Sequence, residues 1–449
     1  MKNPTLAVAK ECCLTGIPHS LLQEFKEQLT LINPAYRDAV KYSRWVGKKL
    51  KKELLFYTLS GDTICFPRGF GNESVRICRK HGVRLQIEDS RSIQPPQAIR
   101  FHGTLRPYQE KAVNAALARD FGVLEAATGS GKTVMAAALI AQRSQPALIL
   151  IHTKELLYQW KERLQSFLKI DPGLIGDGHY QIEPVTVGLI HTVRKHLHTL
   201  PDHFGHIIID EAHRTPSSMF TEIIKEFDCK FMLGLSATPF RRDGLTELIH
   251  WYIGDLVYRV PEGELNKYGA VLKPRIIQRE TSFTFQYRGN YQNLMANLTS
   301  DNDRNRQIAD DVTAVVKKQI GTALIVSDRI GHCEALASLL EERDVKIALL
   351  TGRVSGEERN DIVQALQNGE LQALVATIQL IGEGFDCSGL SSLFLSTPIK
   401  FSGRLTQVIG RILRPAEGKQ PIVYDYIDPV GVLKSSAQAR QQTYEKQNF

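Results

Sequence analysis

Short apolar runs alternate with longer helical stretches in two successive series, and this pattern constrains the fold more than any other feature. The first series lies at about 101–260 and includes the runs 147–151 (ALILI) and 206–210 (HIIID). A second series begins after about residue 300. Strands that are apolar throughout are typical of parallel sheets covered by helices on both faces. We therefore predict an α/β fold with two consecutive parallel-sheet domains, 101–260 and 261–430, and a cleft between them.

The two ends of the chain depart from this pattern. Residues 1–100 mix short apolar runs with one expected helix at 73–81, which indicates a small α+β domain. Gln94-Pro95-Pro96-Gln97 marks its end, because consecutive prolines disfavour a helix. We interpret about 261–300, which is rich in aromatic and polar residues, as a linker with irregular β structure, and 431–449 as a polar tail with a peripheral helix.

Composition excludes several classes of protein. Hydrophobic residues make up 43% of the chain and charged residues 23%, which is typical of a folded globular protein rather than a disordered one. The N-terminus has no apolar segment of the secretory type, and no run approaches the roughly 20 apolar residues that cross a bilayer. We therefore expect a cytoplasmic protein without membrane contact. The seven cysteines form no C-x-x-C pair, so we expect free thiols in a reducing compartment and no structural metal.

The net charge of +8 is concentrated at the N-terminus. Residues 1–104 contain 17 Lys and Arg against 9 Asp and Glu, whereas the remaining 345 residues contain 39 of each. A basic module on a neutral body favours a polyanionic partner such as nucleic acid. The alternative is a surface that is only solvated.

Within this module the segment 37–52 (RDAVKYSRWVGKKLKK) interleaves basic residues with two aromatic ones. Such a pattern suits a surface that follows phosphates and stacks on bases. We take Arg44, Trp45 and Lys48 as candidate DNA contacts. The alternative is that Trp45 belongs to the core and the lysines only keep the protein in solution.

A Gly-rich loop at 126–133 (AATGSGKT) lies between an apolar run and a helical stretch. Strand, loop and helix in this order are the context that a phosphate-binding loop requires. Gly129 and Gly131 would let backbone N–H groups point at phosphate oxygens, and the start of the helix would add positive charge. Lys132 would reach the β- and γ-phosphates, and the Thr133 hydroxyl would bind Mg²⁺. The first residue of the loop is Ala, where the usual pattern has Gly.

Asp-Glu-Ala-His at 210–213 follows the apolar run 207–209. A carboxylate at the end of a strand, about 80 residues after a phosphate loop, can hold Mg²⁺, and its neighbour can orient and deprotonate water. We assign Asp210 to the metal and Glu211 to the water. His213 lies too far along the turn for either task, and we assign it to coupling.

These segments, together with Ser236-Ala237-Thr238 and 407–414 (QVIGRILR), resemble motifs I, II, III and VI of the superfamily 2 helicases. Leu105–Gln109 (LRPYQ) resembles the adenine-recognition segment of the branch that contains XPB-, RadD- and UvsW-like proteins. Further segments are similar to the remaining motifs of the family: 150–157 (Ia), 188–192 (Ib), 325–327 (IV) and 375–386 (V). The resemblance covers residues 105–415 in the family's order.

The resemblance implies two tandem RecA-like domains that use ATP and Mg²⁺ and move along nucleic acid as they close and open. It implies arginine fingers at Arg411 and Arg414, which we expect one turn apart on a helix that also carries Gln407. It assigns nucleotide contacts to Arg106, Gln109, Thr128, Gly129, Ser130, Gly131, Lys132, Thr133, Gly384 and Asp386, coupling to His213, Ser236 and Thr238, and nucleic-acid contacts to Thr153, Lys154, Thr192, Ser327 and Thr377. Each Ser or Thr has the alternative of capping a helix or a turn.

Together these observations favour an ATP- and Mg²⁺-dependent superfamily 2 DNA helicase, similar to phage branch-migration helicases, that regresses forks or migrates Holliday junctions. We expect a monomer that binds branched DNA, with replication or recombination proteins as further partners. The alternatives are an RNA helicase of DEAH type, a nucleic-acid-gated ATPase that clamps or remodels without separating strands, and a restriction motor subunit, for which we see no nuclease motif. The aromatic segment 283–291 is a candidate strand-separating wedge, with a packed strand as the alternative.

Overall fold

The computed structural model describes residues 3–41, 43, 45–47, 50–214, 217–237, 244–268, 272–318, 321–382, 389–400, 402–414, 416, 418–447 and 449. The chain forms two compact units, and each is described by itself. The first comprises Met1–Ala126 and Gly131–Val260, and the second comprises Ala127–Ser130 and Pro261–Phe449. The N-terminal module thus belongs to the same unit as the first α/β domain.

The N-terminal module is built on a sheet of strand order β5-β6-β2-β1-β7. Its elements are β1 (Thr5–Val8), β2 (Glu11–Thr15), α1 (His19–Gln28), β5 (Thr58–Ser60), β6 (Thr63–Pro67), η1 (Arg68–Phe70), α3 (Gly71–Lys80) and β7 (Gln86–Asp89). Strands β1, β2 and β6 pair antiparallel, and β7 runs parallel to β1. Alternate side chains of the central strands, such as Leu14 and Phe66, are buried against Phe25 of α1.

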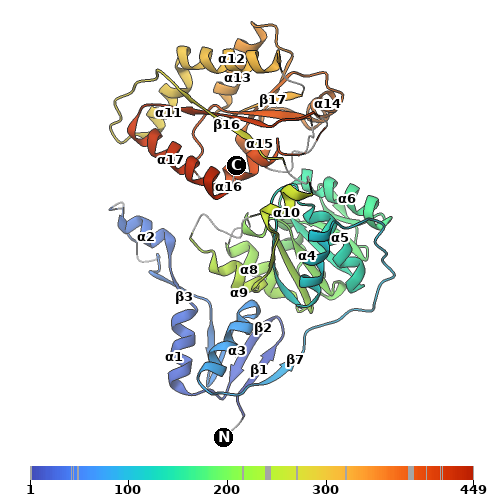
Figure 1. Ribbon diagram of the computed structural model, residues 1–449. Helices are drawn as coiled ribbons and strands as arrows, with labels where there is room; N and C mark the ends of the chain where they lie inside the picture. Colours follow the sequence, from blue (N-terminus) through green and yellow to red (C-terminus); the bar gives the residue numbers. More distant parts are fainter. Residues whose placement is uncertain are drawn as a thin grey trace. The chain divides into compact units, whose positions relative to one another are not determined.

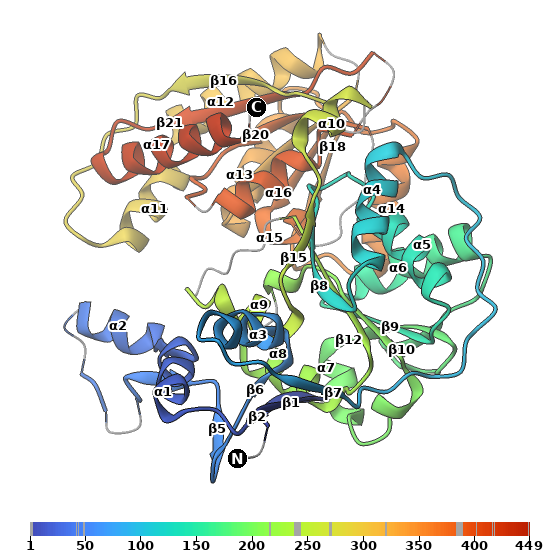
Figure 2. The same ribbon diagram turned by 60° about the horizontal axis from the view of Figure 1, so that its bottom comes forward.

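A second, two-stranded ribbon extends from this module. β3 (Thr30–Ile32) pairs antiparallel with β4 (Glu53–Leu55), and α2 (Pro34–Lys41) lies between them in the chain. We call residues 30–55 the arm. Figures 1 and 2 both show α2 standing away from the sheet of the module.

The first α/β domain contains a sheet of order β11-β10-β12-β9-β13-β14-β8-β15, in which only β11 is antiparallel to its neighbour among the described strands. Its strands are β8 (Phe121–Glu125), β9 (Ala147–Ile151), β10 (Gly173–Gly176), β11 (His179–Tyr180), β12 (Val185–Leu189), β13 (His206–Ile209), β14 (Phe231–Ser236) and β15 (Leu256–Arg259). Every residue of β9 and β13 is buried, which confirms the predicted α/β fold class.

Helices cover both faces of this sheet. In Figures 1 and 2, α4, α5 and α6 lie on one side and α8 and α9 on the other. The helices are α4 (Pro107–Leu117), α5 (Lys132–Arg143), α6 (Lys154–Leu168), α7 (Ile190–Val193), η2 (Arg194–His196), η3 (Pro201–His203), η4 (Ala212–Arg214), α8 (Ser217–Glu226) and α9 (Glu247–Ile253).

Buried contacts join the N-terminal module to the first α/β domain. Arg68 of η1 is only 2% exposed, and its Nη1 donates to the carbonyl oxygen of Cys229 at 2.8 Å. The ring of Phe70 meets Trp251 of α9 edge-on, with 6.2 Å between centroids. Aromatic packing and a buried guanidinium both need fixed geometry. The module is therefore a docked part of the first unit and not a loosely tethered one.

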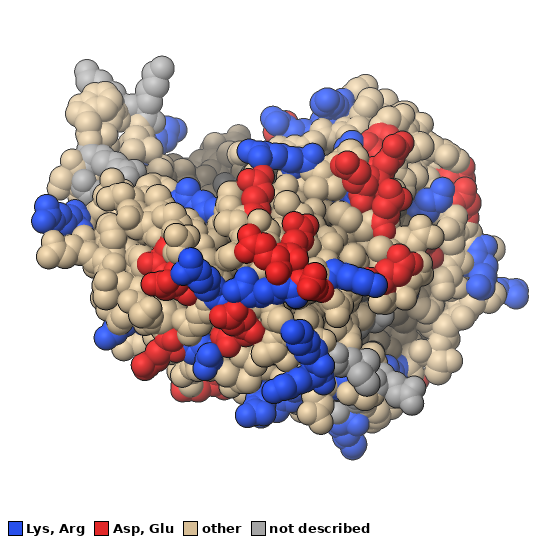
Figure 3. All heavy atoms as spheres, turned by 90° about the horizontal axis from the view of Figure 1, so that it is seen from above, with Lys and Arg blue, Asp and Glu red and all other residues tan. Residues whose placement is uncertain are grey.

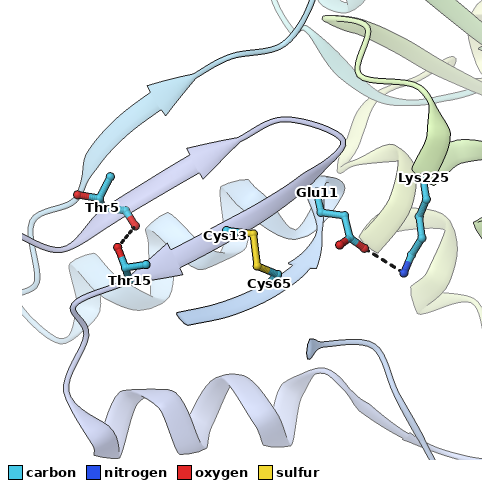
Figure 4. Close-up of a disulfide and its surroundings, with 6 residues drawn as sticks. All are labelled: Thr5, Glu11, Cys13, Thr15, Cys65 and Lys225. Atoms are coloured by element: carbon cyan, nitrogen blue, oxygen red, sulfur yellow. Dashed lines mark hydrogen bonds and ion pairs between the residues drawn. A yellow bond between two sulfur atoms is a disulfide. The ribbon is translucent and has the colours of Figure 1, made fainter. Parts of the chain in front are cut away.

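The expectation of free thiols throughout is wrong for one pair. Cys13 of β2 and Cys65 of β6 form a disulfide, shown in Figure 4. The two residues face each other on neighbouring antiparallel strands, with Cα atoms 4.1 Å apart, although 52 residues separate them in the sequence. The same close-up shows Glu11 beside Lys225 of α8, an ion pair of 2.9 Å that adds a surface contact to the docking.

The second unit contains a parallel sheet of order β16-β21-β20-β17-β19-β18. Its elements are α10 (Glu262–Lys267), β16 (Arg275–Glu280), α11 (Tyr291–Ser300), α12 (Asn302–Val316), β17 (Thr322–Ser327), α13 (Ile330–Glu341), β18 (Ile347–Leu350), α14 (Gly356–Gln367), β19 (Ala373–Thr377), α15 (Ile378–Gly382), β20 (Leu390–Leu395), α16 (Ser402–Gly410), β21 (Ile422–Ile427) and α17 (Gly431–Lys446). The interpretation of 261–300 as a linker is wrong, because β16 pairs along its whole length with β21.

The C-terminal helix α17 is not peripheral, contrary to the sequence-based interpretation. Arg440 is buried, and its Nη2 lies 2.7 Å from Oδ1 of Asp425 in β21. The Tyr444 hydroxyl donates to the other oxygen of the same carboxylate at 2.8 Å. Because most residues of this segment are polar, the sequence did not indicate that one polar face of the helix is buried.

The aromatic segment 283–291 does not form a packed strand within the described residues. Phe283 is buried against Leu294 and Leu298 of α11, whereas Tyr287 and Tyr291 are exposed. The segment is an irregular connection held by its first aromatic side chain.

Charges of both signs lie side by side on the molecular face of Figure 3. Ion pairs of the second unit include Arg279 with Asp311 at 3.0 Å and Arg343 with Asp310 at 2.9 Å. None of the helices in the described part of the chain has the length and apolar character of a bilayer span.

Candidate nucleotide and nucleic-acid site

The Gly-rich loop connects β8 to α5. Gly129 and Gly131 both have φ of +85°, a left-handed conformation that residues with a Cβ rarely adopt. The Nζ of Lys132 donates to the carbonyl oxygen of Ala126 at 3.1 Å, so the amine folds back over the start of the loop. Backbone amides, a lysine and a helix N-terminus therefore gather where the sequence predicts phosphate binding.

Gln109, the predicted adenine contact, stands on the first turn of α4. Its Oε1 accepts a hydrogen bond from the backbone N–H of Arg106 at 2.9 Å, and the side chain is 6% exposed. A Cβ added to Gly131 would lie 2.4 Å from Nε2 of Gln109. The amide therefore packs directly on the phosphate loop, and Gly131 is required there for space as well as for conformation.

Asp210 is held by two hydrogen bonds at the end of β13. The indole N–H of Trp160 donates to Oδ2 at 2.8 Å, and the backbone N–H of Glu211 donates to Oδ1 at 2.9 Å. Burial, followed by the charge of Glu211, raises the pKa of Asp210 to about 6, while Lys132 acts in the opposite direction. Glu211 itself has φ of +49°, the kind of backbone strain that collects at functional sites.

His213 connects this carboxylate pair to the end of the neighbouring strand. Its Nδ1 lies 2.9 Å from the hydroxyl oxygen of Ser236 in β14 and 3.4 Å from Oε2 of Glu211. The structure therefore brings together the predicted water-activating and coupling residues. Thr238, the third predicted coupling residue, lies outside the described residues.

The residues of this site fit a nucleoside triphosphate with Mg²⁺. The left-handed glycines leave room for phosphate oxygens, Lys132 supplies positive charge, and the Thr133 hydroxyl and the Asp210 carboxylate are oxygen ligands of the type that Mg²⁺ prefers. Trp160 was missed by the sequence analysis. It lies 50 residues before Asp210, and no local pattern marks it as a partner of that carboxylate.

The predicted arginine fingers need a correction. Helix α16 ends at Gly410, so Arg411 and Arg414 follow it and do not lie on it as expected. The backbone N–H of Arg411 donates to Val408 at 3.2 Å, an i→i−3 bond typical of a tightened helix end. Its Nε donates to the carbonyl oxygen of Ile381 at 3.0 Å. Gln407 is buried in α16, and the predicted contacts Gly384 and Asp386 lie outside the described residues.

The predicted nucleic-acid contacts of the first α/β domain include two residues with local partners in this structure. The Thr153 hydroxyl caps α6 by accepting the N–H of Leu156 at 3.4 Å. Lys154 forms an ion pair with Asp177, whose other oxygen accepts the Tyr158 hydroxyl at 2.8 Å. Thr192 is half-buried in α7.

Ser327, a predicted contact of the second unit, is fully buried at the end of β17. Its hydroxyl lies 3.0 Å from Nδ1 of His332 and accepts the N–H of Arg329 at 3.1 Å. These neighbours occupy the hydroxyl in this structure, and its phosphate contact stays a prediction. Thr377, at the end of β19, is half-buried.

Trp45 of the N-terminal module is 89% exposed, so the alternative that it belongs to the core is excluded. The other two predicted contacts of this segment, Arg44 and Lys48, lie outside the described residues.

Two family models match parts of this chain. The family model "Type III restriction enzyme, res subunit" matches residues 102–241, and "Helicase conserved C-terminal domain" matches residues 306–416. The chain is 29% identical to the DNA 3'-5' translocase XPB2 of Sulfurisphaera tokodaii, over 76% of this chain and 86% of that protein. It is 27% identical to the ATP-dependent DNA helicase uvsW of Enterobacteria phage T4, over 74% of this chain and 70% of that protein.

Among solved structures, Saccharomyces cerevisiae Dbp5 bound to RNA and ADP BeF3 matches with a TM-score of 0.55 and 16% identity, over 76% of this chain and 86% of that one. This likeness shows the fold, two tandem RecA-like domains. The two family models and the named relatives support an ATP-dependent DNA helicase enzyme. In agreement with the predicted family, they support a member of superfamily 2 that is similar to the XPB- and UvsW-like DNA helicases.

Proposed function

We propose that this protein is an ATP- and Mg²⁺-dependent DNA translocase that remodels branched DNA, by fork regression or Holliday-junction migration. The observation that carries the proposal is the docking of the basic N-terminal module onto the first α/β domain through Arg68 and Phe70. A duplex bound to a rigidly attached module is held at a fixed orientation to the motor domain. The DNA translocase and DNA helicase names of two relatives support DNA as the substrate.

In this proposal the phosphate loop binds the triphosphate. The amides of Thr128 to Gly131 and the amine of Lys132 would hold the β- and γ-phosphates, while Arg106 and Gln109 would recognise adenine. Thr133 and Asp210 would hold Mg²⁺, which neutralises developing phosphate charge when it is bound.

Glu211 would orient the attacking water and accept its proton. Its link through His213 to Ser236 would transmit hydrolysis to the neighbouring strand end. Arg411 and Arg414, with Gln407, would complete the site as the fingers that are worth about 10³–10⁵ in rate. Gly384, Asp386 and Thr238 remain family-based assignments to nucleotide binding and coupling.

The steady-state ATPase rate tests this function. It is measured without nucleic acid and with single-stranded DNA, duplex, a four-way junction and RNA. We expect the junction to stimulate most strongly, Lys132→Ala to abolish hydrolysis, and Glu211→Gln to reduce hydrolysis while ATP binding persists. Lys161→Ala, a surface change on α6, serves as the matched control.

Two results would contradict the proposal. Stimulation by RNA with DNA inert would instead favour the RNA helicase. ATP hydrolysis without strand displacement or branch migration on a labelled junction would favour a nucleic-acid-gated clamp.

A further inference from the structure

The arm has a defined base. The backbone N–H of Asn33 donates to the carbonyl oxygen of Lys52, and its Nδ2 donates to that of Lys51, both at 2.9 Å. Its Oδ1 accepts the N–H of Ala35 at 3.0 Å and so supports the start of α2. Together with the β3–β4 pairing, these hydrogen bonds join the two ends of the arm. The arm is therefore a built projection and not a slack loop.

The projection leaves large apolar side chains uncovered. Among the described residues of α2 only Ala39 is buried, while Ile32, Val40 and Leu55 are each more than half exposed. Trp45 is the extreme case, whereas the chain's other two tryptophans, in α6 and α9, are buried. Several large apolar side chains left exposed on one projecting segment favour a surface that a partner covers.

Charge identifies the partner. Arg37, Lys51 and Lys52 are exposed on the same arm, and the acidic residues of the whole segment 30–55 are Asp38 and Glu53. Aromatic rings combined with cations are the means by which proteins bind unpaired bases and their phosphates. A polyanion with accessible bases therefore satisfies both features of the arm.

The position of the arm relates it to the motor domain. Arg37 lies against Gly244, where an added Cβ would be 3.3 Å from its Nη2. Gly244 belongs to the same compact unit as the first α/β domain. In the other candidate wedge, 283–291, Phe283 is buried, and Tyr287 and Tyr291 are less exposed than Trp45.

We propose that the arm is the branch-point contact of this helicase. Trp45 stacks on an unpaired base where the duplex opens, and Arg37, Lys51 and Lys52 hold the flanking phosphates. This inference rests on the proposed function, because it requires that the substrate be branched DNA. A base stacked on the indole cannot re-pair, so the duplex does not close again after each step of the motor.

The test uses the full chain and a DNA fork with 2-aminopurine at the junction, whose fluorescence falls when the base stacks. Trp45→Ala should abolish the quench and weaken fork binding by about 5- to 150-fold, the ratio that corresponds to ~1–3 kcal/mol for one stacked base. Trp45→Phe should restore most of both. Binding to a blunt duplex and the ATPase rate without DNA should stay within about twofold of wild type.

Two controls sharpen the result. Leu59→Ala, at an exposed apolar position of the same module but outside the arm, should change neither fork binding nor the quench. Lys51→Ala with Lys52→Ala should lower the log–log salt slope on the fork by about 0.9 for each phosphate that the variant no longer neutralises, and should change the slope on blunt duplex less.

Equal fork affinity of Trp45→Ala and wild type would overturn the inference and leave the exposed arm to a protein or lipid partner. An equal loss on fork and blunt duplex would also overturn it, because the contact would then not be specific to the branch. If wild type itself does not distinguish fork from duplex, the proposed function fails first.

Discussion

Three buried arginines, Arg304 and Arg440 in the second unit and Arg68 in the first, are neutralised in different ways. In the second unit each buried guanidinium meets a buried carboxylate: Arg304 Nε lies 2.7 Å from Oδ1 of Asp428, and Arg440 Nη2 lies 2.7 Å from Oδ1 of Asp425. In the first unit Arg68 has the carbonyl oxygen of Cys229 and two sulfur atoms as acceptors, and its Nε has no acceptor among the described residues.

Arg143 of the first unit is bound by carbonyl oxygens, as Arg68 is. It donates to the carbonyl oxygens of Ala116 and Arg119, at the end of α4, and its guanidinium lies over the ring of Phe231. Burial lowers the pKa of Arg143 to about 10. Carboxylate-paired arginines therefore lock α12 and α17 to the end of β21, whereas carbonyl-bound arginines join segments without a countercharge.

Removing the carboxylate partner of a buried arginine should have the largest effect on the free energy of unfolding. Asp425→Ala would leave Arg440 buried and unpaired and would remove the acceptor of the Tyr444 hydroxyl, so we expect a loss of about 3–5 kcal/mol in the free energy of unfolding. Urea denaturation measures it. Replacing both partners, Asp425→Leu with Arg440→Met, should recover much of the loss. A single-variant loss below about 1 kcal/mol would show that the pair is not buried as described.

Acid should also weaken the second unit through His332. Burial, followed by the charge of Arg304, lowers the pKa of His332 to about 3, from an ordinary value near 6.5. Between about pH 6.5 and 3, His332 binds a proton in the unfolded chain but not in the folded one. The free energy of unfolding therefore falls as the pH falls through this range, by about 1.4 kcal/mol per pH unit.

Denaturation of wild type and His332→Gln at several pH values checks this linkage. The variant should be less stable at neutral pH, because the contacts of His332 with Ser327 and Asn305 change. Its stability should nevertheless fall less steeply below pH 6.5. If the stability of the variant and of wild type fell equally steeply with pH, His332 would take up its proton in the folded protein as readily as in the unfolded chain.

Replacing an arginine that has no countercharge should cost less. Arg68→Met loses the hydrogen bond to Cys229 but also removes a buried unpaired charge, so we expect a net loss of about 1 kcal/mol. The same denaturation experiment measures it, with Arg84→Met at an exposed position of the module as control. A loss as large as that of Asp425→Ala would contradict the distinction between carboxylate-paired and carbonyl-bound arginines.

The smallest effect should come from the exposed part of the docking surface. Arg76 and Asp255 lie 3.3 Å apart, and both side chains are about half exposed. Asp255→Asn should lower stability by less than about 1 kcal/mol, and high salt should remove the difference because exposed charges are screened. A loss that persists in high salt would indicate a buried contact.

The sequence by itself determined the fold class and predicted the nucleotide site. The loop 126–133 and the segment 210–213 are each local, since a strand end, a turn and a helix start place their residues without help from distant parts of the chain. Their chemistry could therefore be predicted from residue order. The helix expected through Arg411 and Arg414 was the exception, because helix ends depend on local hydrogen bonds that residue types do not specify.

Tertiary structure alone decided the contacts between distant residues. The Cys13–Cys65 disulfide, the bond from Arg68 to Cys229 and the orientation of Asp210 by Trp160 join residues separated by 52, 161 and 50 positions. No periodicity or motif marks such partners, because they are chosen by strand register and by packing between elements. For the same reason the sequence left Trp45 undecided between core and surface, and only the packing of the module left its indole exposed.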